Sequence, residues 1–241
     1  MNSIEIIRKI IRNLWIVRWI IPTIYFNFHY LPFRQAMYLP ILLRKPRLNK
    51  LKGKVTIMGK VKPGMIRLGI FSVSIYPARG IMFQNCGEII FKGRCRIGND
   101  SYISVGDTGH LIFGDGFSAS SSLKIACYDT IQLDRDVHCG WECIFMDTDF
   151  HRMKYVDRGE SPKAYGPITI GEGCWLGFRS VVQKNTVLPN RTTVASNSLV
   201  NKAYDIPEAS IIGGVPAKLV KTGLYRDMND DSIYYDCKHS N

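Results

Sequence analysis

An aliphatic side chain recurs at every sixth position between residues 170 and 212 of this 241-residue chain. The series is Ile170, Leu176, Val182, Leu188, Val194, Val200, Ile206 and Ile212. A period of six belongs neither to a helix nor to a simple strand, so it indicates a coil that repeats its path. The position four residues after each aliphatic is mostly small: Cys174, Ser180, Thr186, Thr192, Ser198, Tyr204 and Ser210. One large and one small residue per hexapeptide predict an all-β solenoid of triangular section, because the first fills the interior and the second lets the chain turn.

The same register continues upstream with interruptions. Three shorter runs carry it: Phe91, Ile97, Ile103; Phe113, Ala119, Ile125; and Leu133, Cys139, Phe145. Residues 147–167 are rich in Gly, Pro and charged side chains, and they predict a loop that leaves the coil. We expect three parts: an extension over residues 1–52, a β-helix over 53–220 that contains loop 147–167, and a tail over 221–241.

The net charge of +12 is concentrated in the extension and the start of the coil. Residues 1–67 hold fourteen of the 32 Lys and Arg residues but only one acid, Glu5. Ile4, Ile7, Ile11 and Leu14 recur at helical spacing, and aromatic residues follow as far as Tyr30. A basic, apolar helix suits contact with anionic lipid at a membrane surface, and equally a cap that packs on the first coil. Both interpretations stay open here.

Other classes of function fit the chain less well. Arg18 and Pro22 interrupt the apolar run, so it predicts no spanning helix, and no small-residue cleavage site marks a signal peptide. No readout motif accompanies the basic charge, so we expect no nucleic-acid partner. The seven cysteines form no Cys-x-x-Cys pair, so we expect no metal. An odd number without a secretion signal favours reduced thiols in the cytoplasm.

His151 is the histidine that stands out, because it lies at the mouth of the predicted loop in the sequence Asp-Thr-Asp-Phe-His. An imidazole at a coil edge acts as a general base near neutral pH, with Asp149 or Asp147 fixing its tautomer. The same pattern also suits a polar residue at a loop mouth. The spacing leaves both interpretations open.

A second candidate lies at the end of the coil, in the segment from Ile211 to Lys218. Gly213 and Gly214 allow backbone N–H groups to approach a ligand closely, and Lys202 and Lys218 provide charge for phosphates. A plain turn that ends the solenoid explains the glycines equally well.

Residues 90–220 resemble the hexapeptide-repeat acyltransferases, and most closely their sugar O-acetyltransferases of capsule and lipopolysaccharide biosynthesis. The motifs that carry the resemblance are Asp149-Phe150-His151, Pro167 to Gly171, Cys174 to Gly177, Ala195 to Lys202, and Gly213 to Lys218. The resemblance implies a left-handed parallel β-helix, acetyl-CoA as cosubstrate, and a homotrimer with its sites between subunits.

The resemblance also implies roles for single residues. His151 matches the general base of the family. Trp175 and Gly177 match the rung beside the cofactor tunnel, and Ala195 and Ser196 match the stretch that meets the pantetheine arm. Lys202 and Lys218 match basic positions near the CoA phosphates. Phe178 departs from the family, which often has a smaller residue at that position.

The expected function is therefore acetyl-CoA-dependent O-acetylation of a sugar hydroxyl in surface polysaccharide biosynthesis. The acceptor is a sugar or a lipid-linked sugar, and the expected place is the cytoplasm or the inner face of the cytoplasmic membrane. Two alternatives remain: an N-acetyltransferase of the same fold that acts on an aminosugar, and a β-helix that serves only as a scaffold or binding module. The spacings of His110, His138 and His151 do not fit a metal-dependent hydratase of this fold.

Overall fold

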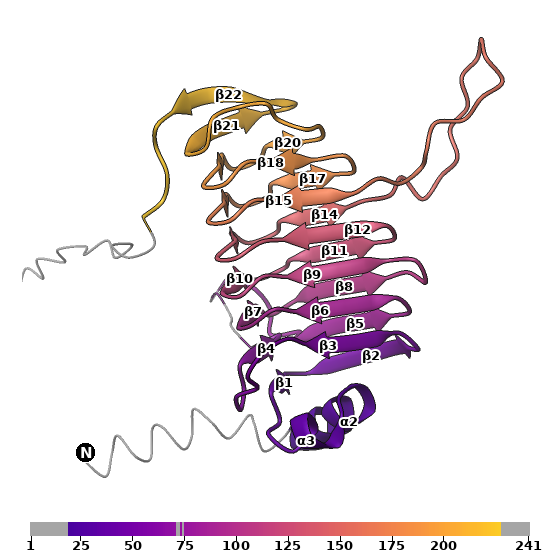
Figure 1. The fold of residues 1–241 in the computed structure, drawn as a ribbon, viewed down its shortest axis with the longest axis vertical. Coiled ribbons are helices and arrows are strands. Elements are labelled where there is room, and N and C mark those ends of the chain that lie inside the picture. Colours follow the sequence, from indigo (N-terminus) through magenta and orange to yellow (C-terminus); the bar gives the residue numbers. More distant parts are fainter. Residues whose placement is uncertain (1–18, 71–72, 74, 228–241) are drawn as a thin grey trace, which may run out of the picture.

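The chain winds as a three-sided parallel β-helix with its strands stacked coil upon coil (Figure 1). The computed structural model describes residues 19–70, 73 and 75–227. Each coil passes through a strand of sheet A, then of sheet B, then of sheet C, before it returns to sheet A. We name the turns between them the A–B, B–C and C–A corners. The all-β, left-handed parallel β-helix predicted from the sequence is confirmed.

Sheet A consists of β1 (Ile41–Leu43), β4 (Ile66–Leu68), β7 (Cys95–Ile97), β10 (Phe117–Ala119), β13 (His138–Cys139), β16 (Trp175–Leu176), β19 (Thr193–Val194), β21 (Ser210–Gly214) and β22 (Ala217–Thr222). Sheet B consists of β2 (Pro46–Leu51), β5 (Ile81–Asn85), β8 (Ser101–Val105), β11 (Lys124–Cys127), β14 (Ile144–Met146), β17 (Val181–Gln183) and β20 (Leu199–Val200). Sheet C consists of β3 (Lys54–Ile57), β6 (Glu88–Phe91), β9 (His110–Phe113), β12 (Thr130–Leu133), β15 (Ile168–Ile170) and β18 (Val187–Leu188).

The six-residue repeat fills the interior of the prism, as predicted. Of its eight aliphatic residues, all but Ile206 are buried, and Ile206 packs partly buried against the same core. The upstream runs point inward too, and Phe91 stacks on Phe113 with ring centroids 5.2 Å apart. A side chain from each sheet therefore reaches the axis in every coil, and these contacts along the prism form one continuous core.

The small residues of the repeat do more than make room for the corners. The hydroxyls of Ser180, Thr186, Thr192, Ser198 and Ser210 each donate a hydrogen bond to the carbonyl three residues earlier. The residue before each hydroxyl has a positive φ. A buried hydroxyl thus satisfies a carbonyl that the sharp turn removes from the strand ladder, which explains why Ser and Thr occupy the position.

The exception in that series closes the C-terminal end of the core. Tyr204 is 7% exposed, and its hydroxyl donates a hydrogen bond to the carbonyl of Ala217 over 3.2 Å. Ala217 begins β22, which folds back on β21 as an antiparallel hairpin. The hairpin and the phenol ring together cover the last coil.

Two helices close the other end, α2 (Ile20–Tyr30) and α3 (Phe33–Ala36). The side chain of Asn27 donates to the carbonyl of Ile41 over 2.7 Å and accepts from its N–H over 3.1 Å. Thr23 accepts from the N–H of Leu43. These bonds satisfy the free edge of β1, and Phe26 packs on Phe83 in the core. Within the described part of the extension, the two helices thus cap the first coil.

The coil begins earlier than the boundary at residue 53 that the sequence suggested. Strand β1 pairs with β4, and β2 pairs with β5, so residues 41–51 already belong to the parallel sheets. The boundary was set too late because Leu48 and Leu51 pack only partly buried and do not follow the six-residue register. The helical spacing predicted from Ile4 to Leu14 lies outside the described residues. Among the residues that are described, no helix is long and apolar enough to span a bilayer.

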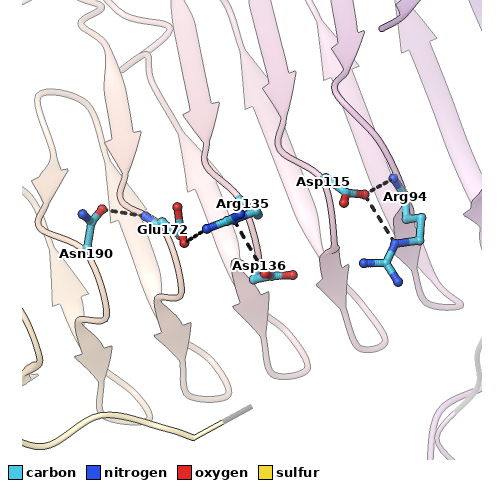
Figure 2. Close-up of polar contacts among 6 residues, drawn as sticks. All are labelled: Arg94, Asp115, Arg135, Asp136, Glu172 and Asn190. Carbon is cyan, nitrogen blue, oxygen red and sulfur yellow. Dashed lines mark hydrogen bonds and ion pairs between the residues drawn. The ribbon is translucent and has the colours of Figure 1, made fainter. Parts of the chain in front are cut away.

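The C–A corner carries a ladder of ionic contacts from coil to coil (Figure 2). Asp115 accepts a hydrogen bond from the N–H of Arg94 over 2.6 Å, and Arg135 pairs with Asp136 and Glu172. The N–H of Glu172 in turn donates to the side chain of Asn190. All these side chains are well exposed, so the ladder adds little stability per contact.

Candidate active site

The loop over residues 147–167 leaves the prism at the B–C corner, between β14 and β15, and projects far from the coil (Figure 1). Its base is held firmly. Buried Asp147 accepts hydrogen bonds from the N–H groups of Tyr128 and Asp129, over 2.7 and 2.8 Å. Thr148 and Tyr165 form an antiparallel bridge across the base, and Phe150 packs on the ring of Tyr128. The predicted loop is therefore present, with His151 just beyond its anchored base.

His151 is exposed at this place. Asp149, the carboxylate expected to orient it, forms an ion pair with Lys184, whose ammonium group also donates to the carbonyl of Lys163 over 2.8 Å. No hydrogen bond joins Asp149 or Asp147 to His151 in the part of the chain that the structure describes. The catalytic roles of His151 and Asp149 stay predictions.

Most of the residues expected to meet the cofactor lie together on sheet A and the A–B corner. Trp175 faces outward from β16, and the turn after it places Gly177 directly on the next coil. A Cβ on Gly177 would lie 2.6 Å from the backbone nitrogen of Ser196, so only glycine fits there. Gly213 packs on the Cβ of Ala195 in the same way one coil later. This packing buries Gly177, whereas the small residues Ala195 and Ser196 of the next coil are exposed.

The segment Gly213 to Lys218 forms the turn of the β21–β22 hairpin, so the structural interpretation of its glycines is confirmed. Gly214 has φ of +106° and donates its N–H to the hydroxyl of Ser198. Lys218 is exposed beside the turn. The ammonium group of Lys202 lies 5.4 Å from the ring centroid of Tyr204, on the B–C side of the same end. Whether these lysines also bind phosphates stays a prediction.

A cleft of about 580 Å³ lies on the outer face of sheet A. Its lining includes Ser118, His138 and Trp175 from neighbouring strands, and Trp141 from the A–B corner. The hydroxyl of Ser118 and Nδ1 of His138 are 2.9 Å apart. Sequence reasoning picked out Trp175 alone from this cleft. The missing signal was the strand register, which places Ser118, His138 and Trp175 in one row.

Two cysteine thiols lie near the cleft, and their burial bears on whether they can act as nucleophiles. Cys139 and Cys143 are buried, and Cys143 donates to the carbonyl of Gly177. Burial, together with the neighbouring thiol, raises the pKa of Cys139 well above its ordinary value. A thiol with a raised pKa carries no nucleophilic thiolate at neutral pH, so a covalent route through Cys139 is disfavoured. Among the described residues, no three His, Cys, Asp or Glu side chains gather as a metal site.

The two groups of candidate residues occupy different parts of the prism. His151, Asp149 and Lys202 belong to the B–C corner, which lies opposite the face of sheet A. Trp175, Gly177, Ala195, Ser196 and Gly214 belong to sheet A and the A–B corner. One chain alone therefore does not bring the expected base to the expected cofactor residues.

The sequence of the chain is similar to those of several known proteins. No protein-family model matches it. A putative lipopolysaccharide biosynthesis O-acetyl transferase of Escherichia coli, WbbJ, is 27% identical over 58% of this chain and 81% of its own length. An uncharacterized 24.8 kDa protein of the cps region of Klebsiella pneumoniae is 28% identical over 82% of this chain and 86% of its own.

A third relative is the galactoside O-acetyltransferase of E. coli, 27% identical over 56% of this chain and 62% of its own length. Together with the repeating coil, these relatives show an enzyme that transfers acyl groups. These relatives support the resemblance of the chain to sugar O-acetyltransferases.

Proposed function

We propose that the protein transfers the acetyl group of acetyl-CoA to a hydroxyl of a sugar in the biosynthesis of a surface polysaccharide. The observation that carries the proposal is the A–B corner beside Trp175, where the small side chains of Ala195 and Ser196 are exposed and Ser196 packs directly on Gly177. A long, thin ligand arm fits such a corner. Because these motifs resemble those of the family, we take the ligand to be CoA. The O-acetyltransferases among the relatives support the sugar hydroxyl as acceptor.

The proposed chemistry is a direct transfer. His151 removes the proton of the acceptor hydroxyl while the oxygen attacks the thioester carbonyl. Backbone N–H groups beside the carbonyl stabilise the oxyanion that forms. The C–S bond then breaks, and the thiolate of CoA leaves and takes the proton from the imidazolium. The raised pKa of Cys139 supports this direct route over one through a thioester on the protein.

Assembly completes the proposed site. We infer a closed homotrimer in which the B–C loop of one copy lies against sheet A of the next, so that His151 meets the neighbour's Trp175. The separation of these residues on opposite sides of one prism supports this arrangement. Cyclic symmetry then repeats the site three times.

The helical cap is the proposed contact with the inner face of the cytoplasmic membrane, where a lipid-linked acceptor lies. Seven large apolar residues on α2, α3 and the turns beside them are exposed: Ile21, Ile24, Tyr25, Phe28, Phe33, Met37 and Tyr38. Ile21 is 77% exposed and Phe33 is 67% exposed. No Asp or Glu occurs between Glu5 and Glu88, so this end of the prism carries only positive side-chain charge. An apolar surface in a basic, acid-free region suits anionic lipid.

The cap must be tested without removing it, because Asn27 and Phe26 hold the first coil. The combined variant Ile21→Ser, Phe28→Ser, Phe33→Ser changes only exposed side chains. We expect the wild type to pellet with vesicles of phosphatidylglycerol and the variant to stay in the supernatant. Equal pelleting of the two proteins would contradict membrane contact through the cap.

The proposed function is tested first by thermal denaturation with acetyl-CoA, which needs no acceptor. At about 100 times its dissociation constant, a ligand stabilises the fold by roughly 2.7 kcal/mol. We expect this shift in the wild type and its loss in the double variant Lys202→Glu/Lys218→Glu. Lys92→Glu is the matched control, because Lys92 is exposed on the C–A corner and far from the hairpin. No shift in the wild type at millimolar acetyl-CoA would contradict the proposal.

A further inference from the structure

Five outward-facing side chains form one row across sheet A. Direct strand pairing places Arg67 beside Arg96, Arg96 beside Ser118, Ser118 beside His138, and His138 beside Trp175. Neighbouring strands are about 4.8 Å apart, so the row runs for roughly 19 Å along the prism. It starts from two guanidinium groups, passes a hydroxyl and an imidazole, and ends at an indole. The cleft of about 580 Å³ covers all of it except Arg67.

The indole end of the row has the features of a site for a sugar ring. Trp175 is 38% exposed with Arg226 over its ring, so a sugar would pack on the part of the side chain that Arg226 does not cover. Trp141 lines the same cleft and is held in place by stacking on Phe178, with centroids 5.5 Å apart. Ser118 and His138 lie beside them with polar atoms that bind hydroxyl groups. A sugar has apolar C–H faces and polar hydroxyl groups. An aromatic ring packs on the first, and neighbouring polar side chains form hydrogen bonds with the second.

The other end of the row has the features of a site for negative charge. Arg67 and Arg96 are directly paired residues, so two like charges lie side by side. Burial, together with the charge of Arg67, lowers the pKa of Arg96. The row contains no Asp or Glu. A third guanidinium in the cleft, that of Arg226, lies at the other end of the row, over the ring of Trp175. A carboxylate or phosphate between Arg67 and Arg96 would relieve their repulsion and gain charge-assisted hydrogen bonds.

We propose that this row is the acceptor subsite and that it selects a saccharide chain carrying a carboxylate or phosphate group. The ring to be acetylated lies near Trp175, and the negative group lies near Arg96 and Arg67. The row is longer than one sugar ring, so the ligand is a stretch of chain rather than a monosaccharide. This inference rests on the proposed function, because it names the class of sugar that receives the acetyl group.

The test is a titration of tryptophan fluorescence with saccharides and no acetyl-CoA. The probes are a galacturonic acid tetramer, the same tetramer as its neutral methyl ester, and a tetragalactose carrying one phosphate. We expect the wild type to bind at least one charged tetramer about ten-fold more tightly than the neutral one, on the scale of one charge-assisted hydrogen bond. The two charged probes distinguish a carboxylate from a phosphate as the selected group.

The variants Arg96→Gln and Arg67→Gln are expected to remove this preference for charge and to leave binding of the neutral tetramer unchanged. Lys92→Gln, which removes a charge near Arg96 in sequence but outside the cleft, is expected to bind like the wild type. Equal binding of charged and neutral tetramers by the wild type would overturn the proposal. An Arg96→Gln variant that keeps the preference of the wild type for a charged tetramer would also overturn it.

The thermal shift with acetyl-CoA is measured on the same proteins. Because it reports the donor, it is expected to stay unchanged in Arg96→Gln. Its absence in the wild type would count against the proposed function, whereas binding of a charged tetramer would still support the subsite. The two proposals can therefore fail separately.

Discussion

The A–B and B–C corners of the same coils are built in opposite ways. At the A–B corner, Gly140 and Gly177 let successive coils pack backbone against backbone. At the B–C corner, the coil instead opens into the loop over residues 147–167, which carries His151 away from the core (Figure 1). One corner is closely packed between coils, and the other opens into a long loop. The comparison teaches that the proposed base and the proposed cofactor residues lie on separate corners of one prism, which the proposed trimer would bring together.

The largest expected effect falls on the B–C corner. His151→Ala removes the proposed base, and general base catalysis contributes about 10²–10⁴-fold, so we expect turnover to fall by that factor. The acetyl-CoA thermal shift should persist, because most of the proposed donor residues lie on sheet A and the A–B corner. The rate of acetyl transfer to a saccharide acceptor measures the turnover. A rate above a tenth of that of the wild type would show that His151 is not the base.

A change at the A–B corner should instead act on stability. In Gly177→Ala the new Cβ lies 2.6 Å from the nitrogen of Ser196, so the coils must move apart. We expect a loss of about 1–3 kcal/mol in the free energy of unfolding, the usual cost of overpacking.

Denaturant unfolding measures this loss, and Gly159→Ala in the B–C loop is the control. No atom lies within 4 Å of a Cβ at Gly159, so only its φ of +62° opposes alanine there. We expect a smaller loss for the control. An equal or smaller loss for Gly177→Ala would show that the A–B corner is not closely packed.

The two corners should also respond to pH with opposite signs. At the A–B corner, hydrogen bonds from Arg179 and Tyr76 hold the pKa of Glu142 below 4.5. Its contribution to stability is present above that pH and is lost as the pH falls through the folded-state value. At the B–C corner, burial raises the pKa of Asp147 above 3.8 despite two backbone hydrogen bonds. Its contribution is present below that pH and is lost as the pH rises through the folded-state value.

Melting temperatures between about pH 3 and pH 7 separate these two effects. We expect Glu142→Gln to weaken the loss of stability on acidification. Asp147→Asn should strengthen it, because the compensating gain at low pH disappears. A shift of the pH profile in the same direction for both variants would contradict the opposed signs.

The smallest expected effect belongs to the third corner, to which we assign no part of the site. Glu172→Gln breaks the ion pair with Arg135 in the ladder of Figure 2, which is exposed to solvent. We expect a loss of less than about 1 kcal/mol that shrinks further in high salt. Thermal denaturation at low and high ionic strength measures it. A large loss that salt does not change would mean that the C–A corner organises the coils.

Sequence periodicity could predict the prism because every aliphatic at the sixth position meets the same axis. It could not place the first coil, because β1 is held by the helical cap through Asn27 and the partly buried residues of β2 do not follow the repeat. Sequence periodicity could not predict the cleft on sheet A, for a different reason. Arg96, Ser118, His138 and Trp175 form a row in space but recur at unequal intervals, because insertions of different length separate their coils. Only strand register brings such residues together.

The central claim is that one copy provides His151 and the next provides Trp175. Mixing two inactive variants, His151→Ala and Trp175→Ala, tests it most directly. Each is unfolded, combined in equal amounts and refolded together, and acetyl transfer is compared with that of each variant refolded alone. If sites form between copies of a closed ring, chance pairing restores both residues in about a quarter of them, so we expect about a quarter of the wild-type activity. A mixture no more active than its components would contradict the shared site.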